Sequence, residues 1–127
     1  MHATLEKVFG YQGNNLNLPV KDVSESLPFY TKIFGFREVS RNDSPHRSVL
    51  LARNQVRLGL AENGGDPSQE GCFFEVDDVE SALAEIKLTK LNVSEPDMQS
   101  INGQTFKAFF VVAPDGLCFM IAQPQPE

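Results

Sequence analysis

The fold of this chain is decided by the stretch Asn17-Leu-Pro-Val-Lys-Asp22-Val-Ser-Glu-Ser-Leu-Pro-Phe29-Tyr30-Thr-Lys-Ile-Phe-Gly35-Phe36. It predicts the end of a strand, a turn, a helix and the start of a second strand. Asp22 is of a type that caps helix N-termini, and apolar residues follow it at helical spacing. Gly35 is placed to end the helix, because glycine readily adopts the left-handed conformation found just past a helix.

A weaker copy of this stretch occurs in the second half of the chain. At one constant spacing, Val20, Asp22, Val23 and Leu27 correspond to Val76, Asp78, Val79 and Leu83. The repeat predicts a chain built from two copies of one unit. It also directs the search for a binding site to the region between the copies.

Hydrophobic periodicity and turn residues give the order of elements in each half. The first half predicts a strand at 14–20, a helix to about 33, a strand at 36–41 and a hairpin of 47–52 with 55–62. The second half predicts a strand at 71–76, a helix from 78 to about 88, a short strand at 92–93, a polar loop at 94–103, and strands at 105–112 and 117–123. Each half therefore reads strand–helix–strand–strand–strand.

This order predicts an α+β fold, with two βαβββ modules that form an open, half-barrel-like curved sheet and helices outside. Residues 1–13 are interpreted as an N-terminal extension. Residues 14–127 are interpreted as a single domain, with modules at about 14–64 and 70–123.

Composition narrows the class of function. The chain has 127 residues and a formal charge of −6, which argues against nucleic acid as a partner. Its apolar runs are far shorter than the ~20 residues of a membrane span. The two cysteines form neither a disulfide framework nor a metal motif, so we expect a reduced, cytoplasmic protein.

The quoted stretch, the second-half Val76-Asp-Asp78 and the turn Pro114-Asp-Gly116 together resemble the vicinal oxygen chelate superfamily. That group includes glyoxalase I, extradiol dioxygenases, fosfomycin resistance proteins and bleomycin resistance proteins. The resemblance covers about 14–123. It implies paired βαβββ modules, often in a homodimer, and in the enzymes a divalent metal held by four side chains on strands that face the cavity.

The residues at the four implied metal positions differ from that pattern. The resemblance places them at Asn15, Gly71, Gly59 (with Leu58 as an alternative) and Met120. Glycine and a thioether do not hold a hard divalent cation, and a side-chain amide is a weak neutral ligand. We therefore expect neither metal nor other cofactor. The closest similarity is to bleomycin resistance proteins, which bind an antibiotic without chemistry.

Strand alternation predicts which side chains face the cavity. The candidate ligand-binding residues are Asn15, Asn17, Arg57, Gly59, Phe73, Glu75, Phe110, Cys118 and Met120. Aromatic and apolar surface with a few polar groups is typical of small-molecule sites. Alternatives remain open for each: the two charged residues either grip a ligand or pair with each other, and the aromatic residues either stack on a ligand or fill the core. Cys118 lacks a neighbouring base and is interpreted as inert.

The preferred hypothesis is a homodimeric small-molecule-binding protein that sequesters an aromatic or amphipathic ligand without a metal. The alternative is a glyoxalase-like lyase or a dioxygenase with a non-standard metal site drawn from Glu75, His46 or Glu62. A third hypothesis is an interaction module with a filled cavity.

Overall fold

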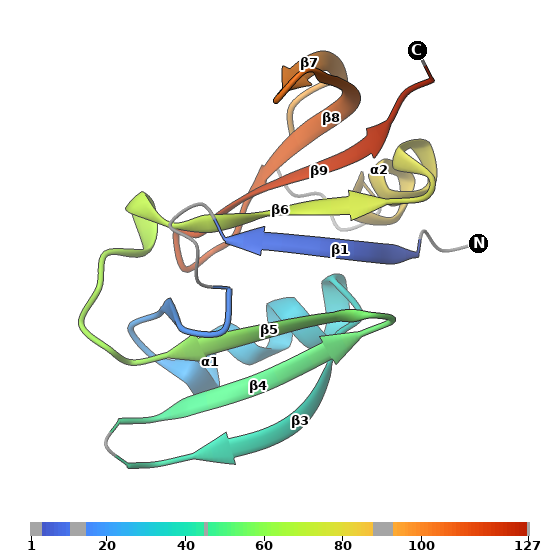
Figure 1. Ribbon diagram of the computed structural model, residues 1–127. Helices are drawn as coiled ribbons and strands as arrows, with labels where there is room; N and C mark the ends of the chain where they lie inside the picture. The colour runs from blue at the N-terminus through green and yellow to red at the C-terminus, as the bar shows by residue number, and fades with distance from the viewer. Residues whose placement is uncertain (1–3, 11–14, 45, 88–92, 127) are drawn as a thin grey trace.

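The computed structural model describes residues 4–10, 15–44, 46–87 and 93–126. Two open, curved sheets lie next to each other, and each carries a helix (Figure 1). The predicted α+β class is confirmed. No helix within these described residues is long and apolar enough to cross a membrane.

The first sheet has the strand order β2-β5-β4-β3. Its strands are β2 (Leu18–Pro19), β3 (Arg37–Asn42), β4 (Ser48–Arg53) and β5 (Val56–Ala61). β2 runs parallel to β5, and the other pairs are antiparallel. The helix α1 (Val23–Pro28) continues into a π-helical turn at Phe29–Ile33, and Gly35 at φ +73° ends it as predicted.

The second sheet has the order β1-β6-β9-β8-β7. Its strands are β1 (Leu5–Gly10), β6 (Gly71–Val76), β7 (Asp97–Ile101), β8 (Gln104–Val112) and β9 (Cys118–Pro124), and its helix is α2 (Val79–Lys87). β6 runs parallel to β9, as β2 does to β5, and antiparallel strands follow in the same order. The two sheets therefore share one connectivity, with β1 as an addition at one edge.

Two predicted elements were wrong, and one strand was not predicted. The predicted loop at 94–103 contains strand β7, whose polar side chains are accommodated because it is an edge strand with mostly exposed residues. The predicted strand at 14–20 is reduced to the two residues of β2. No strand was predicted before residue 14, yet β1 forms there. A register shift between Leu5 and Lys7 breaks its alternation, and this hides the strand in the sequence.

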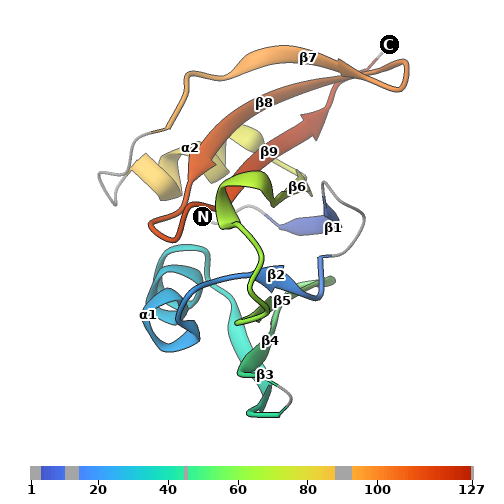
Figure 2. The same ribbon diagram turned by 90° about the vertical axis from the view of Figure 1, so that its left-hand side faces the viewer.

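The hydrophobic core lies between the helices and the sheets, and both helices cover the same side of the molecule (Figure 2). Aromatic rings from both modules meet there. Phe34 lies 6.0 Å from Phe74 and 5.3 Å from Phe119 between ring centroids, and Phe74 stacks on Phe119. This shared core makes the two modules one packed body.

A polar contact also joins the modules. Asp115, in the turn before β9, accepts hydrogen bonds through Oδ2 from the Tyr30 hydroxyl at 2.9 Å and the Ser26 hydroxyl at 3.0 Å. Burial, followed by the negative charge of Asp115, raises the pKa of Tyr30 well above its ordinary value. The Asp115 side chain thus has a second role beyond its turn, because it anchors the second module to α1.

Candidate functional site

The face of the second sheet that points away from the helices carries two rows of side chains fixed by strand register. One row is Lys7, Glu75, Ala122 and Ala108, and the next is Phe9, Phe73, Met120 and Phe110. The intervening residues of β6 and β9, such as Phe74 and Phe119, point into the core instead. We call this surface the open face of the second sheet.

A hollow of about 670 Å³ lies on this open face. Its lining is Lys7, Phe9, Phe73, Glu75, Ile101, Asn102, Gln104, Phe106 and Met120. Five of these nine side chains are apolar, and the polar ones are Lys7, Glu75, Asn102 and Gln104. Such a mixture suits a small molecule, which needs apolar area to bury and a few hydrogen-bonding groups for orientation.

Three aromatic rings form a continuous wall in the hollow. Phe9 and Phe73 lie 6.0 Å apart between centroids, and Phe73 meets Phe106 edge-on at 5.2 Å. Phe106 is buried, Phe73 is half-buried and Phe9 is 56% exposed, so the wall becomes progressively more open towards β1. Exposed aromatic surface of this kind offers a planar ligand an area on which to stack.

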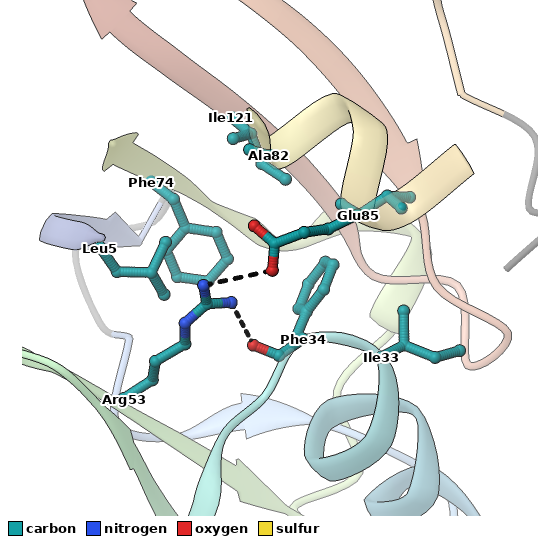
Figure 3. Close-up of a pocket in the computed structure, with 9 residues that line it drawn as sticks. Leu5, Ile33, Phe34, Arg53, Phe74, Ala82, Glu85 and Ile121 are labelled. Carbon is teal, nitrogen blue, oxygen red and sulfur yellow. Dashed lines mark hydrogen bonds and ion pairs between the residues drawn. The ribbon is translucent and has the colours of Figure 1, made fainter. Parts of the chain in front are cut away.

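A second cavity, between the helices, does not fit a ligand. It measures about 20 Å³, which is room for roughly one water molecule. Figure 3 shows Arg53 reaching across it, with Nη1 donating to the Phe34 carbonyl at 2.6 Å and Nη2 paired with Glu85 at 3.5 Å. This region is a polar joint between the modules, and the open-face hollow is the candidate site.

Comparison with protein families matches residues 13–121 to the glyoxalase/bleomycin resistance protein/dioxygenase superfamily. The chain belongs to this superfamily. The match begins after β1, so the superfamily pattern does not account for Lys7 and Phe9, which line the hollow. Comparison with curated protein sequences gives no match.

Several solved structures share the fold. The bleomycin resistance determinant encoded on transposon Tn5 is 24% identical, with a TM-score of 0.68 over 87% of this chain and 96% of that one. TnmS3, an antibiotic-binding protein from Streptomyces sp. CB03234, is 19% identical with a TM-score of 0.71, covering 87% and 93%. FosX, a fosfomycin resistance protein from Listeria monocytogenes complexed with Mn(II), is 17% identical with a TM-score of 0.64, covering 88% and 89%. At these identities the likeness concerns the fold alone.

The residues at the four positions where the resemblance implies metal ligands do not fit a divalent cation. Asn15 is engaged with the backbone of β5, because its Nδ2 donates to the Arg57 carbonyl at 2.7 Å. Gly59 and Gly71 offer no side-chain donor, and Met120 offers only a thioether. Within the described residues, no three His, Cys, Asp or Glu side chains gather in a way that would hold a metal ion.

The predicted site residues from the second module lie on one face. Phe73, Glu75 and Met120 line the hollow. Phe110 and Cys118 lie on the same open face, both half-buried, but are not part of its lining. The pKa of the other cysteine, Cys72, is raised to about 12 by burial, and this buried thiol lies in the core.

The predicted site residues from the first module do not line the hollow within this chain. Arg57 and Asn17 are exposed on the first module. Gly59 is covered by the chain itself: a Cβ there would lie well inside 3.0 Å of the Leu16 backbone, and the Gly59 amide donates to the Asn15 carbonyl at 2.9 Å. The glycine therefore permits a close approach of two backbone segments, which alternation alone does not reveal.

The hollow is also lined by residues that the sequence did not lead us to predict: Lys7 and Phe9 on β1, Ile101, Asn102 and Gln104 around the β7–β8 turn, and Phe106 on β8. The positive φ of Asn102 and Gly103 confirms that turn. Lys7 and Phe9 lie on the edge strand β1 and Ile101 on the edge strand β7, and the sequences of these two strands lack clean alternation. Gln104 and Phe106 lie on the inner strand β8, on the same side as Phe110, and Asn102-Gly103 before them is a strong turn signal in the sequence.

Proposed function

We propose that this protein binds and sequesters an aromatic or amphipathic small molecule without a metal ion and without chemical conversion. The observation that carries the proposal is the hollow of about 670 Å³, with its wall of Phe9, Phe73 and Phe106 and with polar groups beside that wall in its lining. Its apolar area supplies binding energy, since each Å² of apolar surface removed from water contributes ~25 cal/mol.

Metal independence is supported by the donor chemistry at the four superfamily positions. An amide engaged in a backbone hydrogen bond, two glycines and a thioether leave no set of hard ligands. The alternative of a lyase or dioxygenase would need Glu75, His46 or Glu62. Of these, Glu62 already accepts a hydrogen bond from the Val23 amide at 3.0 Å, which caps the start of α1.

A homodimer completes the proposal. The open face presents Phe9 and Val112, which are 56% and 55% exposed, beside the hollow. All six residues of β3, at the edge of the first sheet, are exposed. The strand register places Arg37 and Arg57 on the side of the first sheet that faces away from α1. A second copy of the chain that covers the open face would enclose the ligand and bury this apolar area. We place the binding protein in the cytoplasm.

Elemental analysis of purified protein, with light scattering and a thermal-shift screen, tests the proposal. We expect no stoichiometric metal, a dimeric mass, and a raised melting temperature with planar aromatic compounds, because binding to the native state stabilises it by RT ln(1 + [L]/Kd). Tightly held manganese, nickel, zinc or iron at one equivalent would overturn metal independence, and turnover abolished by chelators would establish the enzyme alternative. Absence of any thermal shift across the screen would favour an interaction module.

A further inference from the structure

We infer that the hollow selects planar aromatic ligands that carry a cationic nitrogen, with Glu75 as the counter-ion. This inference rests on the proposed function, because it names the chemical class of ligand for the same site. It is argued from the arrangement of four side chains on two neighbouring strands.

Lys7 and Phe9 on β1 stand directly opposite Glu75 and Phe73 on β6. Because alternate residues of a strand share a face, these four side chains form a two-by-two square on the open face. Two aromatic rings make up one side of the square and two opposite charges make up the other. A flat ring system resting on Phe9 and Phe73 therefore directs a substituent towards Lys7 and Glu75.

Glu75 is the charge that a ligand would meet first. Its side chain is half-buried and lies nearer the middle of the sheet, whereas Lys7 is exposed on the edge strand. Among the residues that the structure describes, the Glu75 carboxylate forms no hydrogen bond or ion pair. Glu75 lines the same hollow as Phe9 and Phe73, so a cationic group on a ligand that rests on these rings can form a charge-assisted hydrogen bond with its carboxylate.

The aromatic side of the square favours the same charge. The faces of Phe rings carry partial negative charge and attract cations within about 6 Å of the centroid. The formal charge of −6 on the chain adds a weaker long-range attraction for cations. Lys7 opposes this preference, because its ammonium group competes with a ligand for Glu75.

Three fluorescent tricyclic probes of matched shape test the inference: cationic 9-aminoacridine, neutral acridone and anionic anthracene-9-carboxylate. Each is titrated into wild-type protein and into the variants Glu75→Gln, Lys7→Met and Glu80→Gln. Glu80 is exposed on α2, away from the open face, so Glu80→Gln is a control that removes the same charge without touching the hollow. A melting curve for each variant verifies folding.

We expect wild-type protein to bind 9-aminoacridine about tenfold more tightly than acridone, and anthracene-9-carboxylate most weakly. Glu75→Gln should remove about tenfold of the affinity for 9-aminoacridine and leave acridone unchanged, while Lys7→Met should strengthen 9-aminoacridine and Glu80→Gln should change neither. Equal affinity of wild type for all three probes, or an unchanged 9-aminoacridine affinity in Glu75→Gln, would overturn the inference while the proposed function stands. Failure of all three probes to bind would overturn both the inference and the proposed function.

Discussion

The two modules have the same connectivity, but the side of each sheet that faces away from its helix is used in opposite ways. The repeat aligns β2 with β6 and β5 with β9, and the register pairs Leu18 with Leu60 in one module and Phe74 with Ile121 in the other. Gly59 in the first module therefore corresponds to Met120 in the second. The Met120 side chain lines the hollow, whereas Gly59 lies under the backbone of Leu16.

This difference arises from the path of the first residues of the chain. The first residues form β1 at the edge of the second sheet, on the side that faces the first sheet (Figure 1). The chain then crosses to β2 in the first sheet. The crossing segment around Leu16 covers the first module's open side at Gly59. A repeated fold thus gives one covered face and one hollow, and a single chain segment determines which is which.

The largest effect is expected when Gly59 of the first module is replaced by methionine, the residue at the corresponding position of the second module. We expect Gly59→Met to lower the free energy of unfolding by about 4 kcal/mol or to prevent folding, because even its Cβ would overlap the Leu16 backbone. Urea denaturation followed by circular dichroism measures this.

The matched control is Met120→Leu, a volume-conserving change in the second module. We expect it to cost less than about 1.5 kcal/mol, since the hollow beside it accommodates small changes in shape. Similar stability losses for the two variants would show that the modules tolerate side chains equally and that the comparison fails.

The sequence was sufficient to predict the modules but not the edges of the sheets. Asp22 and Asp78 both cap helices, as their place in the repeat indicates, since their side chains accept hydrogen bonds from the first-turn amides. The predicted arm at 55–62 carries apolar residues at Val56, Leu58 and Leu60, and all three are buried on one side of β5. These features follow from local chemistry that one segment carries by itself.

The candidate site required information that no single segment contains. The pairing of β1 with β6 joins residues more than sixty positions apart, and the register shift after Leu5 hides the strand. Phe9 was therefore interpreted as part of an N-terminal extension and not as a residue of a sheet. Gly59 resembled a cavity residue because alternation gives the direction of a side chain, not what lies above it. Long-range strand pairing determined both outcomes.

The next largest effect is expected at the joint between the modules shown in Figure 3. Arg53 on β4 and Glu85 on α2 are each only 16% exposed in their side chains. We expect Arg53→Met to cost about 3 kcal/mol, because it leaves a largely buried carboxylate and the Phe34 carbonyl without this donor. Glu85→Gln should cost less, since Arg53 keeps the Phe34 carbonyl.

A double-mutant cycle with Arg53→Met and Glu85→Leu separates the pair from its surroundings. We expect the double variant to be more stable than the sum of the two single losses predicts, because neither charge of the pair is then kept in the joint without the other. Strict additivity would show that the ion pair does not couple the modules. Lys107 with Glu80, an exposed pair, provides a control with a coupling of about 0.5 kcal/mol or less.

A smaller effect is expected where the second module reaches α1 through Asp115. Tyr30→Phe removes one hydrogen bond to that carboxylate and leaves the one from Ser26, so we expect a loss of about 1–2 kcal/mol at pH 7. Chemical denaturation at neutral pH measures it. A variant as stable as wild type would show that the Asp115 contact does not hold the modules together.

The raised pKa of Tyr30 leads us to expect that the free energy of unfolding depends on pH in the alkaline range. Burial holds the pKa of Tyr30 above its ordinary value of 10.0, so the unfolded state releases this proton first and stability falls as pH rises above 10.0. Tyr30→Phe should lack this part of the loss. Burial of Cys72 adds a loss between pH 9.0 and about 12, which is common to both proteins and cancels when they are compared. Parallel curves above pH 10.0 would contradict the prediction.

The smallest effect is expected from removing the aspartates that cap α1 and α2, Asp22 and Asp78. Asp78 Oδ1 accepts from the Ser81 amide at 3.1 Å and Oδ2 from its hydroxyl at 2.8 Å. Among the described residues, Asp22 accepts from the Ser24 and Glu25 amides but from no hydroxyl. We expect Asp78→Ala to destabilise more than Asp22→Ala, because it also leaves the Ser81 hydroxyl without its acceptor. Thermal melts of the two variants rank them.

The pH dependence of the Asp78 cap gives this ranking a second measurement. Hydrogen bonds from the Ser81 amide and hydroxyl hold the pKa of Asp78 below its ordinary value of 3.8. Its contribution is therefore present above pH 3.8 and is lost as pH falls through the lower pKa of the folded state. Carboxyl groups titrate between about pH 5 and pH 2. On acidification across this interval, Asp78→Asn should lose less stability than wild type. Equal acid losses would mean that the cap bonds do not distinguish the charged from the neutral side chain. The two helix starts would then differ in geometry alone.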